Sequence, residues 1–312
     1  MSHVKFFSAF CFSVLTAGNV FGAGAAGLSC PSNVVLDGGP ADAVLGAGGY
    51  LQCDDTPDAM VIEFYKLGLC KTKPTYDDYG DCEFLFDNSA GKTTTLSVGL
   101  SDSLVDEISI SEGEYPYAML VISNSLGLKN KVVFDNAIWS MDGGVGRYCV
   151  TNSNDHTFAP TDFSDGNYTC YTDSTVQPDV SFVTFQGFFN DDYGVVPNAP
   201  IFTTTLLDQD SSLGATFDVV LLDSEKNVTS IVPAFNQYGS PFPTSQATRL
   251  WGVQTFTKPV VITPDTRNID IGFSIKDGSM LGFGSYCIPS NPEPHCLEMG
   301  SIATFEFVVQ VE

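Results

Sequence analysis

Histidine is scarce in this chain of 312 residues, and its scarcity narrows the chemistry that the protein can perform. Of the three histidines, His3 lies in a leader-like N-terminus, which leaves His156 and His295. Two histidines cannot form a three-histidine zinc site. Neither lies beside a nucleophile motif such as G-x-S-x-G, and no phosphate-binding glycine loop is present. We therefore expect a protein that is not an enzyme.

Basic residues are also few, because 13 Lys and Arg stand against 37 Asp and Glu and give a net charge of -24. Binding to nucleic acid requires clustered Lys and Arg to neutralise phosphates. Nucleic acid and anionic lipid are therefore excluded as partners. Charged residues make up only 16% of the chain, below the usual ~25%, so the sequence is not that of an acidic disordered protein.

Long apolar runs are missing apart from one at the N-terminus. Lys5, the apolar stretch 6–17 and the small residues Ala23-Gly24-Ala25 predict a signal peptide over 1–25. The stretch is shorter than the roughly 20 residues that span a bilayer. Cys30 is not expected to carry a lipid anchor, because its modification would leave an odd number of cysteines. We expect a secreted or cell-surface protein, extracellular or periplasmic, that does not span the membrane.

The sequence contains no C-x-x-C pair and no cysteine–histidine spacing typical of a metal site. Removing Cys11 with the signal peptide leaves an even eight cysteines, which in an exported chain favours disulfides. They fall into neighbouring couples, and the spacing predicts sequential pairing: Cys30–Cys53, Cys70–Cys82, Cys149–Cys170 and Cys287–Cys296. A bridge that closes a loop of about 15 residues is worth roughly 3 kcal/mol in the chain-entropy model.

A helical period is absent, whereas strict alternation of apolar and polar residues recurs, most clearly over 269–276 and 304–311. Shorter strand-like runs include 83–86 and 93–98, separated by the turn signal DNSAGK, and 248–256 and 259–263. The pattern predicts an all-β protein of two β-sandwich domains, prealbumin- or immunoglobulin-like, stapled by disulfides. The expected boundaries are 26–151 for the first domain, 152–179 for a polar linker or tethered loop, and 180–312 for the second.

The segment EGEYPYAMLVIS, residues 112–123, places a glycine-marked turn before an apolar run. Gly113 and Tyr115 form a Gly-x-Tyr, and the run after them resembles a core strand of prealbumin-like (transthyretin-like or Cna-B-type) sandwiches. Pro116 departs from that pattern. The resemblance implies a stalk, adhesive or carbohydrate-associated module. Tyr115 and Tyr117 are expected to pack in a core, and stacking on a sugar is the alternative.

Aspartates cluster in several turn-like segments, among them YDDYGD with Asp77, Asp78 and Asp81. Calcium binds six to eight such oxygen ligands, so these three residues are the candidate calcium site. No cluster matches the EF-hand pattern. The competing interpretation is that Asp stabilises the turn itself.

Asn167 and Asn227 begin N-glycosylation sequons, which chance explains in a chain rich in Asn and Thr. The leading hypothesis is an exported, non-catalytic structural or adhesive protein of the cell surface that self-assembles into a coat or filament by strand pairing. The alternatives are an extracellular carbohydrate-binding protein and a secreted hydrolase with paired carboxylates. Expected partners are therefore other copies of the chain or extracellular glycans.

Overall fold

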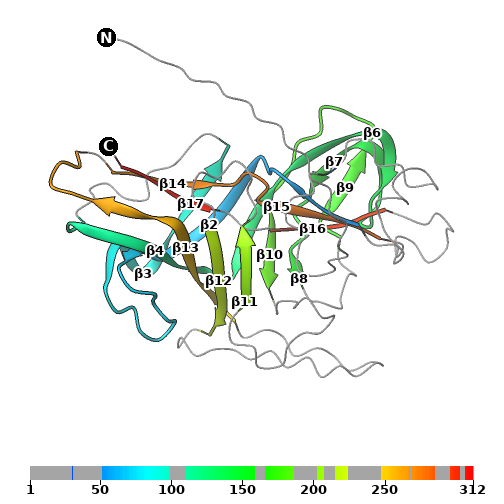
Figure 1. Cartoon of the computed structure of the whole chain (residues 1–312). Helices are drawn as coiled ribbons and strands as arrows, with labels where there is room; N and C mark the ends of the chain where they lie inside the picture. Colours follow the sequence, from blue (N-terminus) through cyan, green and yellow to red (C-terminus); the bar gives the residue numbers. More distant parts are fainter. Residues whose placement is uncertain are drawn as a thin grey trace, which may run out of the picture.

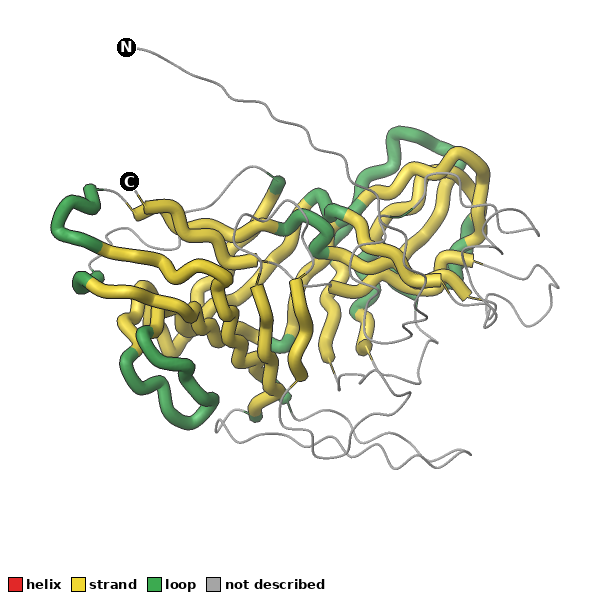
Figure 2. The backbone as a smooth tube through the Cα atoms, viewed as in Figure 1, coloured by secondary structure: helices red, strands yellow, loops and turns green. Residues whose placement is uncertain are grey.

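The computed structural model describes residues 30, 51–98, 110–158, 166–185, 202–206, 215–223, 247–267, 269–284, 296–302 and 306–311. Within these ranges the regular structure is strand and no helix occurs (Figures 1 and 2). The all-β prediction is confirmed. The described residues accordingly include no helix of the length and apolar character needed to cross a membrane. The predicted signal peptide, 1–25, lies outside them.

The largest sheet has nine strands in the order β11-β12-β13-β4-β2-β5-β10-β8, with β3 paired to β2 off this path. Its pairings are antiparallel except that of β10 with β8, which is parallel. The strands are β2 (Ala59–Cys70), β3 (Cys82–Ser97), β4 (Gly113–Ser123), β5 (Ser125–Lys129), β8 (His156–Phe158), β10 (Ser181–Phe185), β11 (Phe202–Leu206), β12 (Ala215–Leu222) and β13 (Arg249–Ile262).

Three smaller sheets complete the described structure (Figure 1). One contains β1 (Leu51–Asp55), β15 (Ser279–Gly284) and β16 (Cys296–Ile302). A second contains β6 (Lys131–Trp139), β7 (Val145–Thr151) and β9 (Tyr168–Tyr171). The third is the pair β14 (Ile269–Ser274) and β17 (Glu306–Val311).

Strand pairing crosses the domain boundary that the sequence suggested. β13 pairs with β4 along the large sheet, and β1 pairs with β15. In both cases one strand precedes the polar segment 152–179 and its partner follows it. The expected division into 26–151 and 180–312 therefore does not separate two hydrogen-bonded units. The segment contains the short strands β8 and β9, and Cys170 of β9 is tied back to β7.

The large sheet buries apolar side chains on both of its faces. Along β4, Ala118, Leu120 and Ile122 belong to the main core, whereas Met119 and Val121 belong to a second cluster. This alternation follows from the period of two along a strand. The second cluster also contains Cys70, Val220, Leu222, Trp251 and Val253.

The pair β14–β17 packs against the main-core face of the large sheet. Phe64 of β2 lies 4.9 Å from Phe273 of β14, centroid to centroid, and Phe273 lies 5.4 Å from Phe307 of β17. Gln254 of β13 donates from Nε2 to the Phe307 carbonyl at 3.0 Å and accepts from the Phe307 N–H at 2.9 Å. One buried amide thereby pairs with a strand backbone as another strand would.

Three predicted disulfides are confirmed: Cys30–Cys53, Cys70–Cys82 and Cys149–Cys170. The last two join residues directly opposite each other in adjacent strands, β2 with β3 and β7 with β9. Cys296 is also disulfide-bonded, and its predicted partner Cys287 lies outside the described residues. Disulfides of this kind persist in oxidising compartments.

Candidate functional site

The candidate calcium residues lie in the loop 71–81, which the Cys70–Cys82 bridge closes. Asp77 accepts a hydrogen bond from Thr75 Oγ1 at 2.7 Å, and Asp78 Oδ1 accepts one from the N–H of Gly80 at 2.9 Å. Gly80 has a φ of 46°, a conformation that suits glycine. These two carboxylates therefore stabilise the turn. Among the described residues, no group of three or more His, Cys, Asp or Glu is arranged to hold a metal ion.

Tyr115 is fully buried in the main core. Its hydroxyl donates to Glu83 Oε1 at 2.8 Å, and the Ser111 carbonyl lies at the same distance. Burial and this bond to a carboxylate raise the pKa of Tyr115 above its usual range. Gly113 has a φ of 154° and is so close to Lys71 that a side chain would collide with it. The ring of Tyr115 has no free face on which a sugar can stack, so its role here is in packing.

Tyr117 lies on the opposite face of the large sheet and packs against the second cluster. Residues two positions apart in a strand, such as Tyr115 and Tyr117, normally point to the same face. Here the paired strand β13 shifts register between Thr255, opposite Tyr117, and Val260, opposite Tyr115. The two tyrosines, which lie on different faces, flank Pro116 at the point where the pairing with β13 is irregular.

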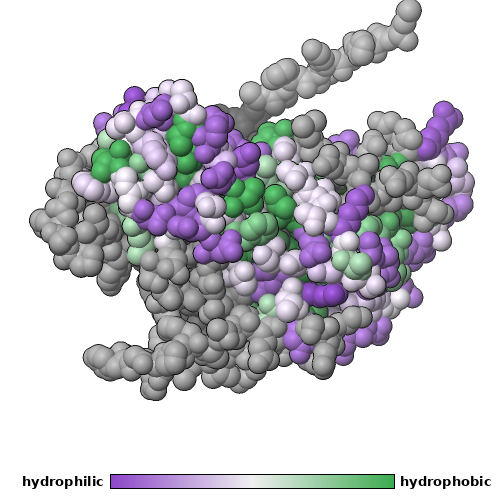
Figure 3. Space-filling model, turned by 180° about the vertical axis from the view of Figure 1, so that it is seen from behind, coloured by the Kyte–Doolittle hydropathy of each residue, from purple (hydrophilic) through white to green (hydrophobic). Residues whose placement is uncertain are grey.

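Tyr117 belongs to a concentration of aromatic side chains, which we call the aromatic face. It occupies the outer face of β2, β3, β4 and β13 together with the loop 71–81. Its members are Tyr65, Tyr76, Tyr79, Phe84, Tyr117 and Trp251. Tyr79 meets Phe84 edge to face at 6.0 Å, and Phe84 is 39% exposed. Figure 3 shows one side of the molecule, on which apolar residues form small groups among hydrophilic ones.

Cations lie directly over the rings of the aromatic face. The guanidinium of Arg249 is 3.8 Å from the centroid of Tyr65, and Lys66 Nζ is 4.8 Å from that of Phe84 and 5.9 Å from that of Tyr79. Such contacts contribute about 0.5–2 kcal/mol, depending on exposure. Lys66 also pairs with Asp87.

The loop 71–81 is fastened to the sheet at several points besides its disulfide. Lys73 forms an ion pair with the buried Asp218 of β12. Lys71 lies 3.6 Å from Glu83 of β3. Burial would raise the pKa of Glu83, but hydrogen bonds from Ser111 and Tyr115, with the charge of Lys71, lower it below its usual value. The loop therefore forms a fixed part of the aromatic face.

Two tyrosines of this face have altered acidity. Burial raises the pKa of Tyr65, and the hydrogen bond that its hydroxyl donates to Glu63 raises it further. Burial also raises the pKa of Tyr79. The nearby charge of Arg249 opposes both shifts without cancelling them. Both hydroxyls remain protonated at neutral pH and are neutral hydrogen-bonding groups.

Trp251 lies beneath this surface and is only 2% exposed. Across the sheet it is paired with Val220 on one side and Val121 on the other, and Val121 is paired with Lys66. Within the described chain, its Nε1 is the one buried side-chain nitrogen or oxygen without a hydrogen-bond partner. A buried donor of this kind costs about 1–3 kcal/mol, so it is a feature that requires an explanation.

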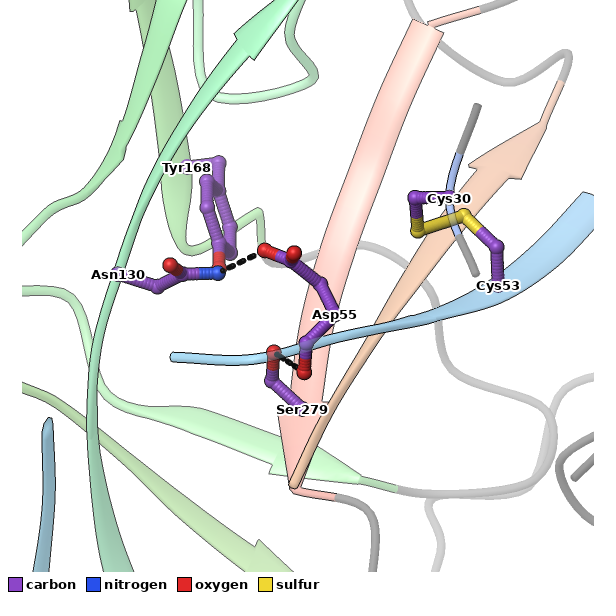
Figure 4. The surroundings of a disulfide bond; sticks show 6 residues. All are labelled: Cys30, Cys53, Asp55, Asn130, Tyr168 and Ser279. Atoms are coloured by element: carbon purple, nitrogen blue, oxygen red, sulfur yellow. Dashed lines mark hydrogen bonds between the residues drawn. A yellow bond between two sulfur atoms is a disulfide. The ribbon is translucent and has the colours of Figure 1, made fainter. Parts of the chain in front are cut away.

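A second polar feature joins β1 to β9, to β15 and to Asn130, which lies between β5 and β6, and is shown in Figure 4 beside the Cys30–Cys53 bridge. Asn130 donates to Asp55 Oδ2 at 2.8 Å and lies 3.0 Å from the hydroxyl of Tyr168. Ser279 donates to the carbonyl of Asp55. Burial raises the pKa of Asp55, the bond from Asn130 opposes the rise, and the charges of Asp58 and Asp277 add to it.

Asn167, the first residue of a sequon, is fully buried. Its amide donates to Gly300 O at 2.8 Å and to Ser181 Oγ at 3.1 Å, and it accepts from the N–H of Gly300 at 2.7 Å. The side chain joins β9 to β16 and presents no free amide for a glycan. Asn227 and His295 lie outside the described residues, whereas His156 begins the short strand β8.

The aromatic face was only partly visible in the sequence. Tyr117 was singled out, and the close cysteines 70 and 82 indicated a stapled loop that carries Tyr76 and Tyr79. No local signal connects them to Arg249 and Trp251, which lie more than a hundred residues further along the chain. Comparison with protein-family models, with curated proteins and with solved structures finds no match to this sequence or fold.

Proposed function

We propose that this protein is an exported, non-catalytic structural or adhesive protein of the cell surface, and that copies of it associate by pairing strand edges. The observation that carries the proposal is the one-sided pairing of β3. This strand is 16 residues long, and its only partner among the described strands is β2. A strand paired on one side offers its other edge as a template for another chain. The three disulfides support an oxidising location.

A sandwich of prealbumin- or immunoglobulin-like layers is part of the same proposal. Support comes from Tyr115, whose hydroxyl lies 2.8 Å from the carbonyl of Ser111, four residues upstream. A tyrosine that bonds back to the preceding backbone at a strand start is a feature of Greek-key sandwiches. The packing of β14–β17 on the large sheet supplies a second layer.

Charged substitutions on the edge test the proposal. Thr93 and Thr95 of β3 are exposed, and the double variant Thr93→Lys/Thr95→Lys places two charges on the strand without altering the core. We expect wild-type protein to form oligomers at micromolar concentration in sedimentation velocity runs. Added salt should favour them, because it screens the net charge of -24. The double variant should remain monomeric.

A charge-matched control separates edge pairing from electrostatics. Thr172→Lys/Gln177→Lys adds the same charge on exposed residues that follow β9. Added lysines reduce self-repulsion in an acidic protein, so charge alone would favour association in both variants. Loss of oligomers in the β3 variant alone supports strand pairing. A monomeric wild-type protein at all salt concentrations, or unchanged oligomers in the β3 variant, would contradict the proposal.

A further inference from the structure

The aromatic face is a surface of partly exposed rings, unlike the edge of β3, and has the features of a surface that binds a small ligand. Phe84 is 39% exposed, and Tyr65, Tyr79 and Tyr117 are each partly exposed. They come from β2, β3, β4 and a disulfide-closed loop, so their positions are fixed by the sheet and by the Cys70–Cys82 bridge. A preformed surface loses little conformational entropy when a ligand binds.

The charges of this face argue against both anionic and cationic ligands. Lys66, Lys71 and Lys73 are each paired with a carboxylate, so they offer little net charge to an anion. The net charge of -24 repels anions further. Arg249 and Lys66 already lie over these rings, and their positive charges would repel a cationic ligand. An uncharged ligand is therefore favoured.

The polar groups between the rings specify the chemistry of that ligand. The neutral hydroxyl of Tyr65, the carboxylate of Glu63 and the guanidinium of Arg249 lie together and can both donate and accept hydrogen bonds. Aromatic surface combined with a few convergent polar groups is typical of small-molecule sites.

We propose that the aromatic face binds a neutral saccharide. The apolar face of a sugar ring lies against the exposed part of Phe84, and its hydroxyls bond to the polar groups around Tyr65. Trp251 lies beneath these rings, so its emission reports on their surroundings. The proposal rests on the side chains of the aromatic face and not on the pairing edge of β3, so it does not depend on self-association.

Fluorescence of Trp251 provides a direct test. The chain has two tryptophans, so a Trp139→Phe background leaves Trp251 as the only one. The full-length mature protein is titrated with neutral hexasaccharides, namely cello-, laminari-, malto-, xylo- and mannohexaose, and with hexagalacturonate as the charged counterpart. We expect at least one neutral hexasaccharide to change the emission of Trp251, and hexagalacturonate to leave it unchanged.

Matched variants locate the binding. Phe84→Ala should weaken binding roughly tenfold, as the loss of one aromatic contact predicts, and Tyr79→Ala should act in the same direction. Tyr171→Ala is the control, because Tyr171 is 40% exposed on β9, away from this face. Circular dichroism and thermal melts confirm that each variant is folded.

Three results would overturn the proposal: no neutral hexasaccharide changes the emission, only hexagalacturonate binds, or Phe84→Ala binds as tightly as Tyr171→Ala does. Failure of self-association with retained saccharide binding would reject only the strand-edge proposal. Retained self-association without saccharide binding would reject only the saccharide proposal.

Discussion

At the scale of single residues, buried polar side chains stand out, because each of them connects separate strands. Asn130 contacts Asp55 and Tyr168, and Asn167 pairs with the backbone of Gly300. Amides suit this position because one side chain both donates and accepts, as a peptide group does. Asp55 differs from them, because it carries a charge into a partly buried site that also faces other carboxylates.

The raised pKa of Asp55 makes it a destabilising group at neutral pH. The folded protein holds this proton more tightly than the unfolded chain does. Its contribution to stability is therefore complete below the ordinary pKa of 3.8 and is lost as the pH rises through the folded-state pKa. Asp55→Asn retains an oxygen that accepts from Asn130 and removes the charge. We expect its melting temperature to exceed that of wild type at pH 7.

The advantage of Asp55→Asn should shrink as the pH falls, because the wild-type side chain then becomes neutral too. Thermal melts of both proteins between pH 3 and pH 8 measure this difference. Asp179→Asn is a control on an exposed carboxylate and should follow wild type at every pH. A difference between Asp55→Asn and wild type that does not change with pH would mean that ionisation of Asp55 is not responsible.

At the scale of secondary-structure elements, the sequence predicted which residues alternate better than it predicted where a strand ends. The runs 83–86 and 93–98 were expected as separate strands with a turn at DNSAGK. They are parts of the single strand β3. Asp87 pairs with Lys66 and Lys92 pairs with Phe64, and the residues 88–91 between them form a bulge. Asn88 accepts from the N–H of Ala90 and donates to the carbonyl of Gly91. The hydrogen bonds typical of a turn are thus formed at a bulge, and the strand continues on both sides of it.

The sequence could not predict which strands lie next to each other, for a physical reason. The alternation of apolar and polar residues indicates which side chains of a strand face a core. It does not indicate which strand is the neighbour, because any strand with an apolar face on the same side fits equally well. The disulfides were predictable because both cysteines of each pair are close in the chain. Gln254 and Phe307 are 53 residues apart, and nothing in their local patterns indicates that they meet.

Gln254 is expected to be one of the most sensitive positions of the second layer. Gln254→Leu keeps the volume but leaves the buried N–H and C=O of Phe307 without their partner, which should cost about 2–4 kcal/mol of unfolding free energy. Chemical denaturation measures it. Gln177→Leu, on an exposed glutamine, should change stability by no more than about 0.5 kcal/mol. Equal midpoints for the two variants would show that the amide pairing contributes nothing.

At the scale of the whole molecule, the described strands form four sheets, and two of these sheets contain pairings that cross the polar segment 152–179. β4 lies between β2 and β13, and β1 completes a sheet with β15 and β16. The expectation of two consecutive domains rested on length and on composition. Composition identifies polar loops, but it carries no information about which strands hydrogen-bond across them.

The interleaved pairing predicts that neither half folds alone. A fragment of residues 26–151 lacks β13 beside β4 and lacks β15 beside β1, so large apolar surfaces on these strands have no cover. We expect it to show no cooperative thermal transition and little dispersion in its proton–nitrogen NMR spectrum, in contrast to the full mature chain. A cooperative transition in the isolated fragment, with its disulfides formed, would restore the division into two domains.

The pairing of β1 with β15 has a consequence for biosynthesis. Thr56 Oγ1 accepts from the N–H of Asp277, and Ser279 bonds to Asp55, contacts that span 221 and 224 residues. During translation β1 emerges long before β15 exists, so the sheet that contains them forms only after nearly all of the chain has been made.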